Sequence, residues 1–257
     1  AFFCPPLSLT GRFIPPHIRV VDEAPHWIVV EKPAHLLVHP TKPSPKTTLW
    51  DELRGLLAFE IACGGQVSII NRLDRETSGL TLVAKDGATA SAFCKLMEQR
   101  RIHKEYLALT WGWPTQDDWT VDAPLLRLGE QAASRIHLKQ AVHPLGAAAC
   151  TRFRVEQRFE NARGRFAVVR AWPETGRLHQ IRVHLAHSGY AVVGDKIYGP
   201  DEGCYLEFIE TGWTESLAQR LLLPRHALHS ASLQIDGLGL QWSIGLPDDL
   251  ATFADHV

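Results

Sequence analysis

The sequence lacks long apolar runs and has few cysteines, and both absences narrow the class of protein it can be. No uninterrupted apolar stretch reaches the ~18 residues that a membrane-spanning helix needs. The first residues have neither the basic segment nor the long apolar segment of a secretion signal. The five cysteines form no Cys-x-x-Cys pair, which argues against a zinc staple or a disulfide framework. We therefore expect a cytoplasmic protein with reduced thiols and no membrane partner.

Positive charge is not in excess either. Lys and Arg total 27 against 28 Asp and Glu, which gives a net charge of −1 with His neutral. A nucleic-acid-binding domain is often basic overall, but affinity for phosphates follows the local patch rather than the total. Hydrophobic and charged contents of 45% and 21% are ordinary for a globular protein. The 257 residues fit one domain or two small ones, behind a proline-rich, extended lead-in over residues 1–17.

Short apolar segments rich in β-branched residues predict strands, and longer segments with apolar residues at helical spacing predict helices. Strands are expected at 18–21, 26–33, 67–70, 79–84, 102–112, 123–126, 147–157, 165–172, 231–235 and 238–244. Helices are expected at 48–59, 87–100, 178–188 and 214–223. Asp86 is expected to cap the second helix and Gly189 to close the third. Residues 161–164, Asn-Ala-Arg-Gly, are typical of a hairpin turn.

Residues 67–85, VSIINRLDRETSGLTLVAK, contain the main candidate site. Two apolar runs flank a polar loop, and loops held between rigid strands often display functional side chains. In this loop Asp74 lies between Arg72 and Arg75, and nearby cations keep a carboxylate ionised even when it is partly desolvated. Without further information, the pattern favours an aspartate that caps a tight turn, with both arginines in solvent.

The segment Arg-Leu-Asp-x-x-Thr-Ser-Gly at 72–79 resembles the signature of the RluA family of pseudouridine synthases, with Asn71 where most members carry a histidine. The resemblance implies that Asp74 is the catalytic nucleophile. It also implies an α+β fold, in which a mixed, mostly antiparallel β-sheet is flanked by helices and loops. Residues 18–257 would form the catalytic domain, and the stretch before them is too short for a separate N-terminal RNA-binding domain.

A second motif of the same family is matched by Lys104-x-Tyr106, which follows a basic helix end. In the family this tyrosine lies against the target base. Without the resemblance, a lone strand tyrosine is usually a core ring with a solvated hydroxyl. The residues around it form a basic cluster that would bind RNA phosphates or be an ordinary helix end: Lys95, Arg100, Arg101, His103 and Lys104.

A third motif is matched by Gly-Arg-Leu-His-Gln-Ile-Arg-Val-His-Leu at 176–185. The resemblance implies that Arg182 bridges to the catalytic aspartate, whereas the pattern alone fits a solvated surface arginine. Leu178 stands where the family more often has Thr or Ser. Along the expected helix, Ile181 and Leu185, with Leu178, are expected to bury one face.

The activity that the resemblance implies is the isomerisation of specific uridines in structured ribosomal or transfer RNA to pseudouridine, on a flipped-out base. The product is an isomer, so no cofactor is expected, and we expect a monomer whose partner is RNA. An ionised carboxylate suits the chemistry because it can attack and later leave. The implied catalytic residues are Asp74, Tyr106 and Arg182, and the implied substrate-binding residues are Arg72, Arg75, Lys104, His179 and Leu228.

Three alternatives compete with this function, and the spacing argues against the third. One is a catalytically inactive RNA-binding protein of the same fold. Another is a hydrolase with a carboxylate nucleophile, such as a glycosidase, which needs a second carboxyl group, for which Glu76 is the nearest candidate. The third is a metal site built from His179, His184 and His187, but no HExxH is present and the first two point apart on a helix, so no metal is expected.

Overall fold

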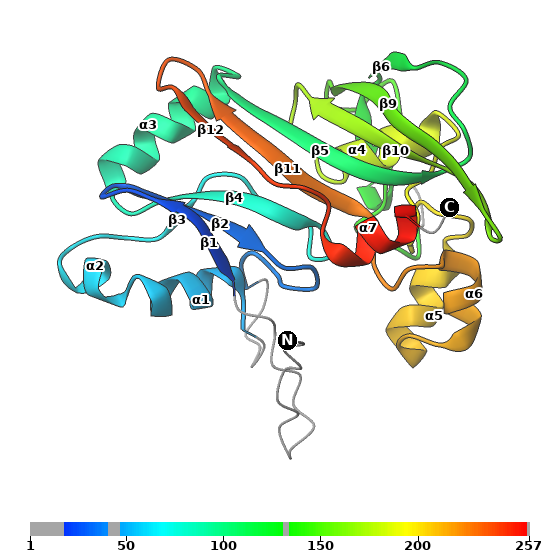
Figure 1. Ribbon diagram of the computed structural model, residues 1–257, viewed down its shortest axis with the longest axis horizontal. Helices are drawn as coiled ribbons and strands as arrows, with labels where there is room; N and C mark the ends of the chain where they lie inside the picture. The colour runs from blue at the N-terminus through cyan, green and yellow to red at the C-terminus, as the bar shows by residue number, and fades with distance from the viewer. Residues whose placement is uncertain (1–17, 41–46, 131–133, 256–257) are drawn as a thin grey trace.

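The computed structural model describes residues 18–40, 47–130 and 134–255 (Figure 1). The extended lead-in expected over residues 1–17 lies outside them. Most of the strands form one long sheet, whose main path runs through β1 (Arg19–Glu23), β2 (Trp27–Lys32), β4 (Ser78–Ala84), β11 (Leu228–Ile235), β5 (Ile102–Trp111), β10 (Gly164–Pro173), β9 (Cys150–Asn161) and β6 (Asp118–Asp122). Attached to it are β12 (Leu240–Ser243), which pairs with β11, and β3 (Ser68–Ile69), which pairs with β4.

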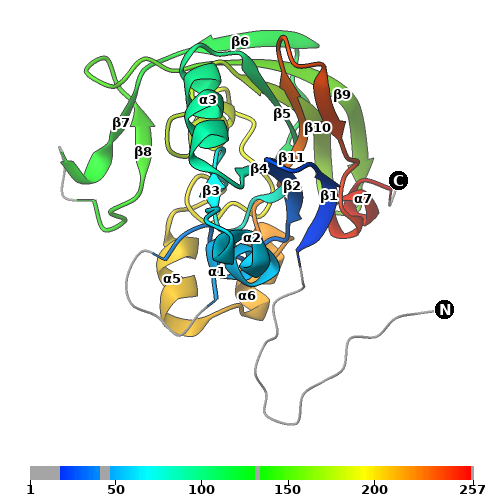
Figure 2. The same cartoon turned by 90° about the vertical axis from the view of Figure 1, so that its left-hand side faces the viewer.

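A smaller sheet contains β7 (Leu125–Arg127) and β8 (Gln140–Val142), and Figure 2 shows this pair to one side of the main sheet. Each strand expected from the sequence has a counterpart, although the one predicted at 123–126 begins later, at β7. The sequence did not predict β6 or β8. β6 alternates exposed and half-buried residues at the sheet edge, and β8 has only three residues, so neither carries a strong apolar pattern.

The sheet is mixed because β4 and β11 run parallel, while the other strand pairs described are antiparallel. The expected α+β fold with a mostly antiparallel sheet is thus confirmed. In the parallel pair Ser78 lies opposite His229, and Gly79 lies opposite Ser230. Gly79 has φ +113°, and a Cβ there would lie 2.3 Å from the Ser230 carbonyl oxygen, so only glycine fits this approach. The pairing fixes the end of the Asp74 loop against the start of β11.

The helices lie between and beside these strands. They are α1 (Leu49–Leu56), α2 (Ala58–Ala62), α3 (Gly87–Glu98), α4 (Gln180–His187), α5 (Gly203–Thr211), α6 (Glu215–Leu221) and α7 (Asp248–Asp255). None of the helices in the described part of the chain is long and apolar enough to cross a bilayer. The cap predicted for α3 is confirmed, since Asp86 accepts a hydrogen bond from the Thr89 amide. The sequence did not predict α5 or α7.

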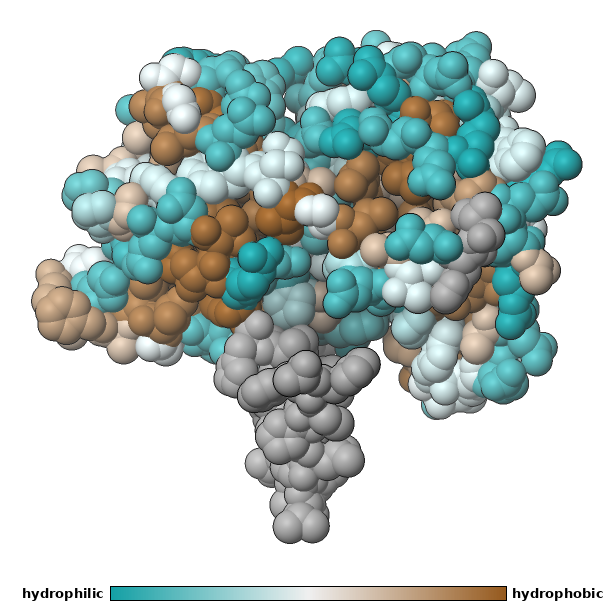
Figure 3. Space-filling model, in the orientation of Figure 1, coloured by the Kyte–Doolittle hydropathy of each residue, from teal (hydrophilic) through white to brown (hydrophobic). Residues whose placement is uncertain are grey.

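The single helix expected at 48–59 is wrong in one respect, because the chain forms two helices that meet at Leu57. Leu57 has φ −100° and ψ 26°, outside the helical region, while its side chain stays buried with Leu53. Leu56 is 49% exposed and Phe59 is 78% exposed. Figure 3 shows apolar surface at the lower left, over the place of α1 and α2 in Figure 1.

The helix expected at 178–188 is also shorter than predicted, because α4 begins at Gln180. His179 has φ 56°, a left-handed conformation that stops the helix from extending backwards. The side-chain amide of Gln180 accepts a hydrogen bond from Thr175 Oγ1 (2.7 Å) and donates one to the Cys150 carbonyl (2.9 Å). Leu178 is 46% exposed, so its expected burial is wrong, whereas Ile181 and Leu185 are buried as predicted.

Two helices cover opposite faces of the sheet. In Figure 1, α4 lies behind β5 and β10, and α7 lies in front of them. On the α7 face, Phe253 packs edge-on against Phe159 and Phe166, with ring centroids 6.3 and 5.1 Å away. The main apolar core contains side chains from both faces, so the sheet is rigid where the three family-like motifs meet it.

Candidate active site

A cleft of about 700 Å³ opens between the Asp74 loop, β5 and the start of α4. Asp74, Tyr106, Arg182 and Leu228 all line it, although they come from four segments far apart in the sequence. Its volume is in the range of pockets that hold small-molecule groups such as a nucleobase. The structure therefore brings the three predicted catalytic side chains to one cavity.

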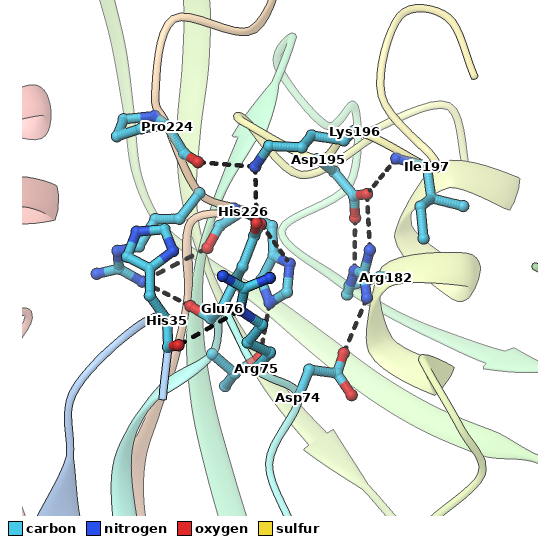
Figure 4. Close-up of polar contacts among 12 residues, drawn as sticks. His35, Asp74, Arg75, Glu76, Arg182, Asp195, Lys196, Ile197, Pro224 and His226 are labelled. Carbon is cyan, nitrogen blue, oxygen red and sulfur yellow. Dashed lines mark hydrogen bonds and ion pairs between the residues drawn. The ribbon is translucent and has the colours of Figure 1, made fainter. Parts of the chain in front are cut away.

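Asp74 and Arg182 form an ion pair, with Arg182 Nη1 donating to Asp74 Oδ2 at 2.9 Å (Figure 4). The other edge of the guanidinium faces Asp195, to which Nε and Nη2 donate at 2.6 and 2.8 Å. Asp195 also accepts from the backbone amides of Ile197 and Tyr198. Arg182 thus lies between two carboxylates, and only Asp74 of the two keeps exposed side-chain surface, at 24%.

The buried charges of Arg182 and Asp195 stabilise each other. Burial disfavours the charge of Arg182, but the attraction of Asp195 and Asp74 outweighs it and raises the pKa of the guanidinium. Burial alone would raise the pKa of Asp195, yet the Arg182 charge and the hydrogen bonds lower it. Arg182 is therefore a permanent cation beside Asp74, which is the environment that a carboxylate nucleophile needs.

Tyr106 is buried in β5 and its ring forms part of the cleft wall. Burial, followed by the negative charge of Asp74, raises the pKa of its phenol. The hydroxyl therefore stays protonated at neutral pH. An aromatic wall with a neutral polar tip is suited to holding a planar base.

The loop that carries Asp74 is anchored by buried polar groups. Lys32 Nζ donates to three backbone carbonyls, among them that of Arg75 at 3.2 Å, and burial lowers the pKa of this amine to about 7. Asn71 donates to the Leu80 carbonyl (3.0 Å) and accepts from the Leu82 amide (2.8 Å). The side chain of Asn71 thus forms hydrogen bonds with the backbone of β4. This contact gives a structural role to the asparagine that stands where most family members carry a histidine.

A second buried network lies behind the loop (Figure 4). Glu76 Oε1 pairs with Lys196 Nζ at 2.8 Å, and Glu76 Oε2 accepts from the His226 amide at 3.2 Å. The His226 ring shares a 2.7 Å hydrogen bond with Thr77 Oγ1, and burial followed by the charge of Arg182 lowers its pKa well below the ordinary value. Glu76 is committed to this network, which counts against the second, proton-donating carboxyl group of a glycosidase.

Sequence reasoning missed the roles of Asp195, Lys196 and His226. Each lies in a turn or at a strand start with no apolar periodicity. The available signal was the run Gly-Asp-Lys-Ile-Tyr-Gly at 194–199, which is typical of a turn and places an acidic and a basic residue side by side. A buried partner for Arg182 could have been sought there, since buried guanidinium groups require carboxylates.

The five predicted substrate-binding residues all line the cleft. Arg72 and Arg75 are exposed, and Arg75 Nε donates to the His35 carbonyl at 3.3 Å. Burial lowers the pKa of Lys104. Burial, followed by the charge of Arg182, lowers the pKa of His179 to about 4. Leu228 is buried, with 4% of its surface exposed.

The five residues of the predicted basic cluster do not gather at the cleft. Of its members only Lys104 lines the cleft. Arg101 Nη2 donates to the Asp236 carbonyl at 3.2 Å, and the His103 ring lies 2.7 Å from the Asp236 carboxylate. Phosphate binding by the cluster stays a prediction.

No group of three His, Cys, Asp or Glu side chains among the described residues could hold a metal ion. Of the three histidines considered, His184 is buried and its ring nitrogens meet Thr151 Oγ1 (2.9 Å) and the Ala123 carbonyl (3.0 Å). His179 Nδ1 lies 2.8 Å from Tyr198 Oη. Both rings thus have protein partners.

The chain is similar to known proteins over most of its length. Residues 26–187 match the family model described as RNA pseudouridylate synthase. The ribosomal large subunit pseudouridine synthase D of Escherichia coli (strain K12) is 34% identical over 253 residues, covering 93% of this chain and 71% of that protein. The protein of the same name from Pseudomonas aeruginosa is 37% identical over 242 residues, covering 90% and 69%.

Two solved structures share the fold. Human RNA Pseudouridylate Synthase Domain Containing 4 superposes with a TM-score of 0.69 at 24% identity, covering 91% of this chain and 90% of that one. Human RNA Pseudouridylate Synthase Domain Containing 1 gives 0.67 at 23% identity, covering 95% and 86%.

Proposed function

The chain belongs to the RNA pseudouridylate synthase family, and on that premise we propose that it converts uridine in large-subunit ribosomal RNA to pseudouridine with Asp74 as nucleophile. Membership of the family makes it an RNA-modifying isomerase. The choice of ribosomal RNA rests on the relatives above, which are named as ribosomal large subunit pseudouridine synthases. The observation that carries the residue assignment is the Arg182–Asp74 ion pair at 2.9 Å in a cleft walled by Tyr106.

The reaction breaks one carbon–nitrogen bond and makes one carbon–carbon bond. The bond between ribose C1′ and uracil N1 breaks, the base rotates, and a bond forms between C1′ and C5. The C5 proton is lost and N1 takes up a proton, so atoms and charge balance without a cofactor. The Asp74 carboxylate provides the electron pair that attacks either C1′ of the sugar or C6 of the base. It is released by displacement from C1′ as the C5 bond forms, or by elimination from C6 afterwards.

Arg182 has two tasks in this scheme. Its guanidinium orients the Asp74 carboxylate through one N–H and balances its charge before attack. After an ester or adduct forms, Asp74 is neutral, and Arg182 still has Asp195 as its counter-ion. The cation therefore does not become an uncompensated buried charge at the intermediate, which would be costly.

Tyr106 supports the base. Its ring offers a surface on which the detached uracil stacks while it rotates, inside a cavity that limits loss to water. The charge of Asp74 is one of the causes that raise the Tyr106 pKa, and that charge disappears when Asp74 is esterified. Loss of that charge lowers the Tyr106 pKa, so the phenol releases its own proton more readily after attack than before it, and the phenolate is the form that takes up the C5 proton.

The target uridine has to leave its stack to reach Asp74, because the carboxylate lies inside a cleft rather than on an open surface. Unstacking a base costs a few kcal/mol, and the cost is least in single-stranded loops. Arg72 and Arg75 are exposed cations at this cleft and suit the neighbouring phosphates.

Tritium release tests the proposal. Ribosomal RNA transcripts labelled with tritium at uracil C5 lose the label only when a carbon–carbon bond forms there. We expect release from the large-subunit transcript with the wild-type protein. Release from transfer RNA alone would correct the substrate, and no release from either RNA would contradict the proposed function and favour an inactive RNA-binding protein.

A further inference from the structure

Exposed apolar side chains gather at the mouth of the cleft. Leu138, Leu178 and Ile209 are 44%, 46% and 60% exposed, yet all three line the same cavity as Asp74. Tyr205, one helical turn before Ile209 on α5, lines it as well. We call these four side chains the apolar rim. Contiguous exposed apolar surface beside a binding cleft marks a contact site for a ligand or partner.

Tyr198 holds the segments of the rim together. Its hydroxyl accepts a hydrogen bond from the Gln140 amide at 2.9 Å and lies 2.8 Å from His179 Nδ1. Gln140 is two residues after Leu138, and His179 directly follows Leu178, so the two leucines are brought to the same place. An ion pair between Lys139 and Glu202, the residue before α5, ties that helix to the same segment.

The rim is continuous with the catalytic group. The Arg182 guanidinium carbon lies 5.1 Å from the centre of the Tyr198 ring, and the same guanidinium binds Asp74. A cation also lies beside the rim. Gly176 is two residues before Leu178, and a Cβ at Gly176 would lie 3.8 Å from Lys104 Nζ. An apolar surface next to a cation matches a nucleotide, which has an apolar base face and an anionic phosphate.

We propose that the apolar rim packs against an unpaired nucleobase adjacent to the target uridine in the same RNA strand. The inference rests on the proposed function, which puts the uridine in the Asp74 cleft. Eversion of that uridine removes a stacking partner from the neighbouring base, and single-stranded bases are held by apolar and aromatic side chains. Because the rim is the exposed part of the cleft lining, a nucleotide next to a uridine held at Asp74 lies within its reach.

Binding of a short RNA hairpin with one loop uridine tests the proposal, with the nucleotide on either side of the uridine replaced in turn by an abasic residue. For wild-type protein, one of the two abasic replacements is expected to raise Kd about 5- to 10-fold. Leu178→Ser and Ile209→Ser should each weaken binding of the intact hairpin by a similar factor. Leu238→Ser is the matched control, since Leu238 is 53% exposed and does not line the cleft.

A sharper test asks whether the effects of the protein substitutions and of the abasic replacement on Kd depend on each other. In the double variant L178S/I209S, the abasic replacement should cost no further affinity, because the surface it contacts is already gone. Equal abasic penalties in wild type and double variant would overturn the proposal, as would unchanged Kd in both single variants. A change in self-association of the variants without a change in Kd would assign the rim to a second copy of the chain and would overturn it too.

The outcome is separable from that of the proposed function. Kd is measured without turnover, so a wild-type protein that releases no tritium would contradict the proposed chemistry while the Kd comparison still decides the rim. Conversely, suppose that the wild-type protein releases tritium but the abasic penalty is the same in wild type and in L178S/I209S. The proposed function would then stand, and the proposed role of the rim would be rejected.

Discussion

Asp195 holds the Arg182 guanidinium by two hydrogen bonds, from Nε at 2.6 Å and Nη2 at 2.8 Å, and leaves Nη1 to Asp74. The carboxylate of Asp195 is fully buried, so this pairing fixes the plane of the guanidinium. The direction of the Nη1–H bond, and with it the orientation of the Asp74 carboxylate, follows from that plane. Asp195 is therefore a positioning residue that acts through Arg182.

Replacing Asp195 with Asn tests this relationship. Asp195→Asn removes the negative charge and one acceptor, so the unfolding free energy should fall by about 3 kcal/mol because a buried guanidinium loses a partner. The kcat should fall at least about 10-fold while KM changes little, since only the orientation of Asp74 is disturbed. Urea unfolding and initial-rate kinetics measure the two quantities. Asp248→Asn, at the exposed start of α7, is the control, and wild-type kcat and stability in Asp195→Asn would refute the positioning role.

Arg182 itself should not tolerate lysine. Arg182→Lys keeps the charge but loses the planar guanidinium, whose three separate nitrogens bind Asp195 twice and Asp74 once. We expect kcat to fall at least about 100-fold, because one point charge cannot orient both carboxylates. Arg163→Lys in the exposed turn between β9 and β10 should match wild type. Activity of Arg182→Lys within a few-fold of wild type would show that the planar contact is dispensable.

Buried histidines should make stability fall in acid. Burial, followed by nearby arginine charges, lowers the pKa of His179 and of His229 from the ordinary 6.5 to about 4. Each ring is neutral when folded, and the unfolded chain takes up the proton first as pH falls. The stabilisation is fully present above pH 6.5. As the pH falls from 6.5 to about 4, the free energy of unfolding should decrease by about 3 kcal/mol for each ring.

The measurement is urea unfolding of wild type and His229→Asn at pH 7 and pH 4.5. His229→Asn should be less stable at pH 7 because its ring shares a 2.8 Å hydrogen bond with Ser78, but its loss of stability on acidification should be smaller. An equal loss in both proteins would mean that His229 is not buried as a neutral ring.

Arg72 should contribute to RNA binding without taking part in bond making. It is exposed at the cleft and makes no hydrogen bond or ion pair with any residue in the described ranges. Arg72→Ala should raise KM about 5- to 10-fold and lower the slope of log Kd against log salt by about 1, as expected for one lost phosphate contact. Arg163→Ala is the control. Unchanged affinity and rate in Arg72→Ala would exclude both a phosphate contact and a gap-filling role.

The sequence predicted the strands and the three motif residues well, for two different reasons. Strands such as β4 and β5 carry a local apolar pattern, which needs no knowledge of the rest of the chain. Asp74, Tyr106 and Arg182 were found because of their order and spacing relative to a known family, and the structure brings them to one cleft. Their catalytic roles stay predictions.

What the sequence could not predict depends on contacts between distant segments. The start of α4 is fixed by Gln180 reaching Thr175 and Cys150, so the periodic pattern that extended the helix back to Leu178 was overridden. The Glu76–Lys196 pair joins residues 120 positions apart, and neither residue has a local signal of burial. The exposed position of Leu178 follows from the left-handed backbone of His179, which periodicity does not reveal.

The most direct test of the central assignment compares Asp74→Asn with wild type on the same labelled large-subunit transcript, in turnover and in RNA affinity. Asp74→Asn preserves size and polarity but removes the nucleophilic carboxylate, so tritium release should fall at least about 1,000-fold while Kd for RNA stays within a few-fold of wild type. The exposed Asp117→Asn should behave as wild type. Tritium release by Asp74→Asn at near wild-type rate would contradict the assignment of Asp74 as nucleophile.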